Sequence, residues 1–124
     1  ALDIAGVKPP ADFHCDGLSL AKFFQGGPAP QRDYFYWELH EYQTLQAARW
    51  SHWKAVRNGP VAKMEIYDLD ADPGEKTNLA TQHPELVTKA LEIFKEAHKD
   101  DPNWPMLTVK EIQQRAAAEK AKGK

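Results

Sequence analysis

A cysteine beside a histidine is the first feature of this chain whose residue types suggest chemistry. Cys15 directly follows His14, and an imidazole paired with a thiol is the arrangement that activates a cysteine nucleophile. The partners in such a pair meet through the fold rather than along the chain, so the adjacency favours an incidental thiol in a loop. We therefore predict no catalytic residue in this chain.

Alternating aspartates are the second such feature. Asp68, Asp70 and Asp72 occur in DLDADPGEKTNL, spaced like the first ligands of an EF-hand calcium loop. That loop requires glycine at its sixth position and Asp or Glu at its twelfth, whereas here those positions hold Pro73 and Leu79. A strand end followed by a Pro-Gly turn explains the segment more simply. The five histidines show no compact metal spacing either, and we predict no metal site.

The segment QAARWSHWKAVRN places two tryptophans among basic side chains. This mixture occurs in β-strands that bind nucleic acid, in β-strands of a catalytic site and in well-packed hairpins. Nucleic-acid binding requires a basic face with stacking aromatics, but Glu38 and Glu65 on neighbouring segments cancel much of the charge. Trp50 and Trp53 flank a two-residue turn and can stabilise a hairpin by packing alone. We expect no nucleic-acid partner. An autonomous carbohydrate- or nucleic-acid-binding module that uses this aromatic hairpin stays as the alternative function.

The composition is that of a globular chain long enough for one modest domain. Its 124 residues are 42% apolar and 27% charged, with a net charge of -2, and no apolar run approaches a membrane span. The N-terminal segment ALDIAGVKPP has no signal-peptide pattern and reads as a helix end closed by Gly6. A chain that begins in this way is expected to be cut from something larger, and we expect no membrane segment in it.

Three or four antiparallel strands in meander order are predicted in the first half of the chain. In RDYFYWELHE, aromatic residues occupy both alternating faces, which favours a strand partly covered on each side. TLQAARW and WKAVRN follow as two strands around a two-residue turn. The dipeptide Asn58-Gly59 is a strong turn signal ahead of the strand KMEIYDL.

The second half is predicted to be helical. Pro84 suits a first helical position, and apolar residues then recur at helical spacing in a stripe that should pack on the sheet. The stripe consists of Leu86, Val87, Ala90, Leu91, Ile93, Phe94 and Ala97. Thr108 and Glu111 form a capping-box pattern before a last helix. The fold class is therefore α+β: a small three- to four-stranded antiparallel sheet, a C-terminal amphipathic helix packed on one face, and a further terminal helix.

Several spaced motifs, taken in order, resemble the C-terminal subdomain of type I sulfatases, the arylsulfatase-like family. The family pattern runs Y-W-E, then Q-A-V-R-x-G-x-W-K, then L-Y-D-L-x-x-D-P-x-E-x-x-N-L-A. This chain matches the pattern at Tyr36-Trp37-Glu38, Gln46-Ala47-Ala48-Arg49, Trp53-Lys54, Tyr67-Asp68-Leu69, Asp72-Pro73-Gly74-Glu75 and Asn78-Leu79-Ala80. The resemblance covers about Leu2 to Leu91 and leaves the last helix outside.

The resemblance implies a parent enzyme that hydrolyses sulfate esters, such as those of carbohydrates. Residues 1–30 would be a linker entering from a missing large domain, residues 31–100 the sulfatase C-terminal α+β subdomain, and residues 101–124 a terminal loop and helix. The parent would use calcium and a formylglycine made from Cys or Ser in a C-x-P-x-R-like motif. Cys15 is followed by Asp16-Gly17-Leu18 and does not match that motif, so this chain alone is expected to be inactive and to carry no cofactor.

The same resemblance implies the partners and the location of the parent. The expected partners are the N-terminal sulfatase catalytic domain and a sulfated carbohydrate substrate, in the periplasm or outside the cell. Within this arrangement the chain is structural and forms one wall of the substrate cleft. The candidates for substrate contact are His40, Glu41, Gln46 and Arg49.

Arg49 is the strongest of these candidates. Its planar guanidinium can hold a sulfate or carboxylate with two parallel hydrogen bonds. The alternative is an ion pair with Glu38 or Glu65 across the sheet. The resemblance also implies a buried Trp53, and it places Ser51 where the family usually has glycine, at a turn position that often needs positive φ.

Overall fold

The computed structural model describes residues 2–13, 15, 17–41 and 43–122, which fall into two units divided after Arg32. The first unit holds two single-turn helices, α1 (Leu2–Ala5) and α2 (Ala21–Phe24). Gly6 ends α1 with a φ of 67°, as the sequence predicts for a helix cap. His14 lies outside the described residues, and so does any pairing of its imidazole with the Cys15 thiol.

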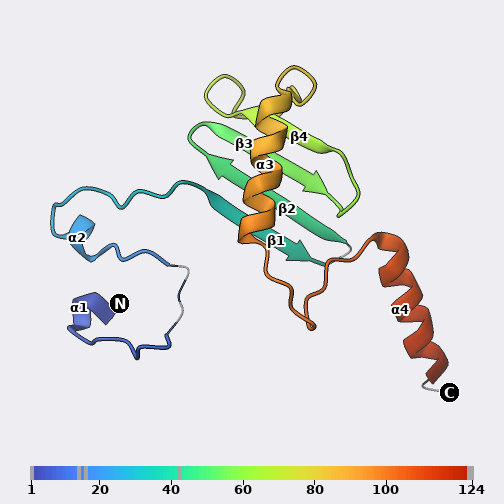
Figure 1. Ribbon diagram of the computed structural model, residues 1–124, viewed down its shortest axis with the longest axis horizontal. Coiled ribbons are helices and arrows are strands. Elements are labelled where there is room, and N and C mark those ends of the chain that lie inside the picture. The colour runs from blue at the N-terminus through green and yellow to red at the C-terminus, as the bar shows by residue number, and fades with distance from the viewer. Residues whose placement is uncertain (1, 14, 16, 42, 123–124) are drawn as a thin grey trace. The chain divides into compact units, whose positions relative to one another are not determined.

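The second unit is built on one antiparallel sheet whose strands lie in chain order (Figure 1). The strands are β1 (Phe35–His40), β2 (Thr44–Trp50), β3 (Trp53–Asn58) and β4 (Met64–Asp68). Trp50 pairs with Trp53, so the predicted two-residue connection between β2 and β3 is present. The predicted α+β fold with a small antiparallel sheet is confirmed, and the sheet has four strands.

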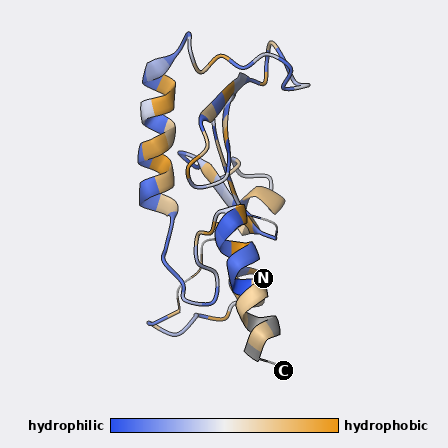
Figure 2. Ribbon diagram, turned by 90° about the vertical axis from the view of Figure 1, so that its right-hand side faces the viewer, coloured by the Kyte–Doolittle hydropathy of each residue, from blue (hydrophilic) through white to orange (hydrophobic). Residues whose placement is uncertain are grey.

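Helix α3 (Pro84–Ala97) lies across one face of the sheet (Figures 1 and 2). The core between them consists of Ala48, Trp50, Ala55, Met64, Ile66, Ala90, Ile93 and Phe94. The predicted helical stripe is confirmed, except that Leu91 is 46% exposed. Each helical residue turns by about 100°, which places Leu91 at the edge of the stripe centred on Ala90.

The strands present an inner face to α3, and we call the opposite face, which α3 does not cover, the open face. On β1 the inward residues are half-buried, whereas Phe35, Trp37 and Leu39 are about half exposed. The sequence predicts partial cover on both faces of this strand, but within the second unit only the inner face is covered by a helix. By strand register the open face also carries Leu45, Ala47, Arg49, Lys54, Val56, Glu65 and Tyr67.

The turn between β2 and β3 agrees with the expectation at Ser51 and departs from it in which tryptophan is buried. Ser51 adopts a φ of 50°, so the position does require the left-handed conformation that glycine accepts more easily. Trp50, at 4% exposure, is the tryptophan in the core, whereas Trp53 is only half-buried. Trp53 lies at the end of the sheet where α3 begins, and its ring is 5.6 Å from that of His83.

The last helix, α4 (Val109–Lys122), begins with the predicted capping box. Glu111 N donates to Thr108 Oγ1 at 3.3 Å, and Thr108 N donates to Glu111 Oε2 at 2.8 Å, which confirms this N-terminus. The segment before α4 is bonded to the start of β2. Thr44 N donates to the Leu107 carbonyl at 3.0 Å, and Leu107 N donates to Thr44 Oγ1 at 2.9 Å. No helix in the described ranges is long and apolar enough to cross a membrane.

Candidate functional site

The turn after β4 accounts for the acidic residues that resemble a calcium loop. Asp72 Oδ2 accepts two backbone N–H groups at 2.7 and 2.8 Å, and Asn78 Oδ1 accepts the N–H of Ile66 on β4 at 3.1 Å. Lys54 Nζ lies 2.6 Å from Glu75 Oε1 and ties the turn to β3. Across the described part of the chain, no group of three or more His, Cys, Asp or Glu side chains could hold a metal ion.

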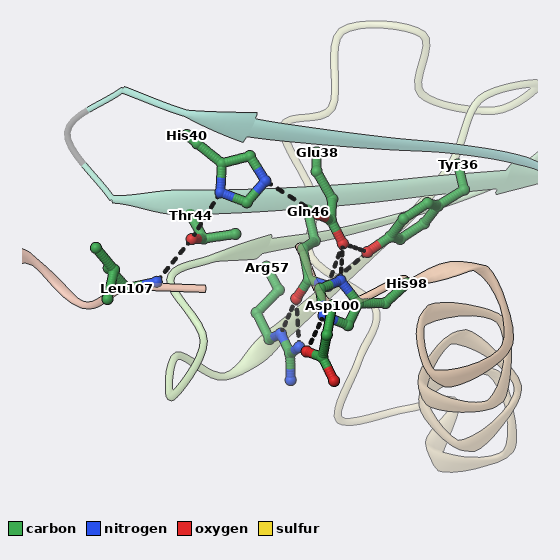
Figure 3. A network of polar contacts seen from close by, with 9 residues as sticks. All are labelled: Tyr36, Glu38, His40, Thr44, Gln46, Arg57, His98, Asp100 and Leu107. Carbon is green, nitrogen blue, oxygen red and sulfur yellow. Dashed lines mark hydrogen bonds and ion pairs between the residues drawn. The ribbon is translucent and has the colours of Figure 1, made fainter. Parts of the chain in front are cut away.

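A polar network centred on Glu38 occupies the inner face near the end of α3 (Figure 3). The Glu38 carboxylate accepts the hydroxyl of Tyr36, and its oxygens lie 3.0 Å from His40 Nε2 and 2.6 Å from His98 Nδ1. His98 Nε2 also lies 3.1 Å from Asp100. The network therefore joins β1 to the residue that caps α3.

Hydrogen bonding outweighs burial in setting the direction in which the pKa values of Glu38 and His98 shift. Burial by itself raises the pKa of Glu38, but the hydrogen bonds from Tyr36, His98 and His40 bring that pKa below its ordinary value of 4.5. Burial likewise lowers the pKa of His98, whereas its bonds to Glu38 and Asp100 hold the pKa above 6.5. At mildly acidic pH the network therefore contains a carboxylate in contact with an imidazolium.

Gln46, one of the predicted substrate contacts, is 1% exposed and has partners for both ends of its amide (Figure 3). Its nitrogen donates to the Tyr36 hydroxyl at 2.6 Å, and its oxygen accepts Arg57 Nε at 2.9 Å. The Arg57 guanidinium lies 5.4 Å from the centre of the Phe94 ring. Gln46 therefore holds Arg57 in place above the core.

His40 and Glu41 come together at the end of β1, where they line a cavity of about 230 Å³ that we call the Trp104 cavity. Both ring nitrogens of His40 already have partners, because Nε2 lies near Glu38 and Nδ1 lies 3.3 Å from Thr44 Oγ1. Glu41 is exposed. His40 thus lines the cavity with both ring nitrogens engaged, and the ring centre of Trp104 is 6.2 Å from its own.

Arg49 lies apart from the other three candidates, on the open face. It lines a cavity of about 410 Å³ with Trp37, Lys54 and Glu75, which we call the Arg49 cavity. The alternative ion pair with Glu38 or Glu65 is not formed between these described residues. Glu38 faces the opposite side of the sheet, and Glu65 accepts the Tyr67 hydroxyl at 2.7 Å. The guanidinium of Arg49 has no carboxylate partner among the described residues.

The four candidates therefore occupy three places: His40 with Glu41, Gln46 in the interior, and Arg49 across the sheet. Sequence reasoning missed His98 and Trp104, which come from loops beyond α3 and meet β1 only through the fold. It also missed Glu38 as the centre of a network. The inward alternation of Tyr36, Glu38 and His40 on one strand was the available signal.

The residues present do not fit the cofactors implied for a sulfatase. Cys15 is exposed, its sulfur accepts the N–H of Gly17 at 3.3 Å, and the residues after it do not form the C-x-P-x-R-like motif. The aspartates that could suggest calcium are engaged in backbone turns. Neither group is assigned a place in this chain.

Comparison with known proteins finds curated proteins that are similar to this chain, although no family model matches it. The N-acetylgalactosamine-6-O-sulfatase of Bacteroides thetaiotaomicron is 42% identical over 43 residues, which make up 35% of this chain and 8% of that protein. Arylsulfatase K of Mus musculus is 31% identical over 98 residues, or 69% of this chain and 17% of that protein. The chain resembles the C-terminal subdomain of type I sulfatases.

The fold of this sulfatase-like subdomain also recurs in solved structures. The structure of BT4656 in complex with its substrate D-glucosamine-2-N,6-O-disulfate matches with a TM-score of 0.62 at 25% identity. The match covers 77% of this chain and 22% of that one. The sulfatase-like subdomain thus spans less than a quarter of each of these relatives. The alternative of an autonomous binding module is not favoured by them.

Proposed function

We propose that the whole protein is a sulfatase that hydrolyses sulfate esters of carbohydrates, and that this chain is its C-terminal structural subdomain. The similarity to sulfatases in sequence, over a fold that recurs in a complex with a sulfated sugar, carries the proposal. One relative is named for N-acetylgalactosamine 6-O-sulfate and another binds a disulfated glucosamine. Sulfated amino sugars are therefore the substrates to test first.

The partner of this subdomain is the N-terminal catalytic domain of the same protein, and the open face is where we place the contact. Phe35, Trp37 and Leu39 are 47–51% exposed there, and a row of large apolar side chains on one face marks an interaction surface. The catalytic residues, the calcium and the formylglycine belong to that domain. The whole protein is located in the periplasm or outside the cell.

Arg49 is the residue of the open face through which this subdomain reaches the substrate. Its charge is exposed and has no carboxylate partner in the described residues, so it is available to a sulfate or carboxylate. His40 and Glu41 contribute to a second part of the cleft, and Gln46 acts by positioning Arg57. The subdomain forms a wall of the cleft and leaves the chemistry to the catalytic domain.

Arg49→Lys in the whole protein tests this role. The change keeps the charge but removes the paired hydrogen bonds, so kcat/KM for a sulfated saccharide should fall about tenfold while the free energy of unfolding stays nearly unchanged. Lys99→Arg, an exposed conservative change outside both cavities, is the control. Unaltered kinetics would remove Arg49 from the substrate site but leave the sulfatase assignment in place.

Two assays test the assignment itself. The whole protein should hydrolyse a generic aryl sulfate or a sulfated amino sugar when supplied with calcium, and failure on every sulfate ester tried would contradict the proposal. The 124-residue chain alone should show no turnover, because no catalytic motif was found in it. Turnover by the purified chain would show that the structural role is wrong.

A further inference from the structure

We propose that the Trp104 cavity binds one sugar ring that carries an anionic substituent, at a subsite formed by the end of β1 and the segment that leads into α4. The cavity holds about 230 Å³, which suits one ring rather than an oligosaccharide. The anionic character of the ligand rests on the proposed sulfatase function, whereas the cavity itself follows from the geometry alone.

The walls of the cavity are fixed by hydrogen bonds between distant segments (Figure 3). Thr44 is 1% exposed and lies between Leu107 and His40. The Leu107 N–H donates to the Thr44 hydroxyl, whose oxygen is 3.3 Å from His40 Nδ1, and the other ring nitrogen bonds Glu38. With Nε2 donating to the carboxylate, Nδ1 is the acceptor for the Thr44 hydroxyl proton. A ligand therefore meets a wall that is already ordered.

Two aromatic rings meet at an angle on this wall. Trp104 is 61% exposed, and its ring is inclined by 45° to that of His40 at a centroid distance of 6.2 Å. A largely exposed tryptophan that lines a cavity offers a flat apolar surface with one N–H donor at its edge. The C–H face of a pyranose ring matches that surface, and its hydroxyls match the donor.

The rest of the lining supplies polar groups that the described part of the chain leaves unpaired. Glu41, Gln43, Asn103 and Arg115 all line the cavity, and their side chains have no hydrogen bond or ion pair with another described residue. Amide and carboxylate groups recognise hydroxyls, and the guanidinium recognises a sulfate or carboxylate with paired donors. An aromatic platform, two neutral amides and the Arg115 guanidinium, whose charge also acts on Glu111, together point to a sugar whose anionic substituent lies at Arg115 and away from the Glu41 carboxylate.

Direct binding is the first test. The 124-residue chain, labelled with ¹⁵N, is titrated with N-acetylglucosamine 6-sulfate, with unsulfated N-acetylglucosamine and with sodium sulfate. The sulfated sugar should shift the Trp104 indole N–H signal in a saturable way, and Trp104→Ala should weaken binding about tenfold. Phe24→Ala removes another exposed ring, which is 68% exposed and outside the cavity, and should change nothing. Arg115→Gln should abolish the preference for the sulfated sugar.

Three outcomes overturn the inference: no saturable shift with either sugar, equal shifts with sodium sulfate alone, or full binding by Trp104→Ala. If a variant of the isolated chain fails to fold, the whole protein decides. There Trp104→Ala should raise KM for a sulfated oligosaccharide about tenfold while leaving kcat for a small aryl sulfate unchanged. If the whole protein hydrolyses sulfate esters and Trp104→Ala leaves KM unchanged, the subsite is rejected and the sulfatase assignment stands. If the protein binds the sugar but hydrolyses no sulfate ester, the subsite stands and the sulfatase assignment is rejected.

Discussion

Ser51 shows how one residue can hold a strained conformation in a well-formed hairpin. Its φ of 50° costs about 1–2 kcal/mol for a residue with a β-carbon, whereas glycine loses about 0.5–1 kcal/mol of chain entropy. Ser51→Gly should therefore stabilise the chain by up to about 1 kcal/mol in urea unfolding. Ser51→Ala keeps the β-carbon and serves as control. Destabilisation by the glycine would show that the Ser51 hydroxyl, 3.2 Å from His52 Nδ1, matters more than the backbone.

Phe94 is the residue on which the packing of α3 most depends. It is 3% exposed, its ring meets Tyr36 edge-on at 5.4 Å, and the Arg57 guanidinium lies over it. Phe94→Ala should lower the free energy of unfolding by about 3–5 kcal/mol, because the cavity cannot close while the polar network holds its edges. Leu91→Ala, at 46% exposure on the same helix, is the matched control. A loss below about 1 kcal/mol for Phe94→Ala would contradict a core position.

At the scale of elements, the contact of His98 with Glu38 fastens the end of α3 to β1 and makes this junction depend on pH. The raised pKa of His98 means that its stabilisation is complete below about pH 6.5 and is lost as the pH rises through the folded-state value. The lowered pKa of Glu38 means that its share is present above about pH 4.5 and is lost as the pH falls through its folded-state value. The junction is therefore most stable in mild acid.

His98→Gln should remove this dependence. Between pH 5.5 and pH 8.5 the unchanged chain should lose about 1 kcal/mol of unfolding free energy that the variant does not lose. His52→Gln, which alters a histidine away from the network, provides the control. Urea unfolding at both pH values measures the difference. Equal losses in the unchanged chain and in His98→Gln would show that the contact contributes nothing at the acidic end.

The elements themselves were largely predictable, because each follows from a local pattern. Alternation along the strands, the two-residue turn and the capping box at Thr108 depend on neighbours in the sequence. The site was much less predictable. His98 and Trp104 meet β1 only after α3 has crossed the sheet, and Gln46 is buried because Arg57 and Tyr36 satisfy its amide. No local pattern records such partners.

At the scale of the whole molecule, the open face should make the isolated chain self-associate. Phe35, Trp37 and Leu39 are exposed side by side, and edge or face contacts between copies would cover them. Sedimentation should show a concentration-dependent increase in mass, which Trp37→Glu suppresses by placing a charge on the face. Val61→Glu, at an 86% exposed position off the face, should not suppress it. A monomer that persists at high concentration would contradict self-association through the open face.

The strand order β1-β2-β3-β4 also has a consequence for how the chain folds during synthesis. Every strand pairs with its neighbour in the sequence, so the sheet closes only short loops and can form quickly as the chain emerges. Helix α3 is made later, and until it arrives the inner face is as bare as the open one. A pause in synthesis after β4 has emerged from the ribosome and before α3 has emerged would leave a paired but uncovered sheet, at its most vulnerable to a neighbouring nascent chain.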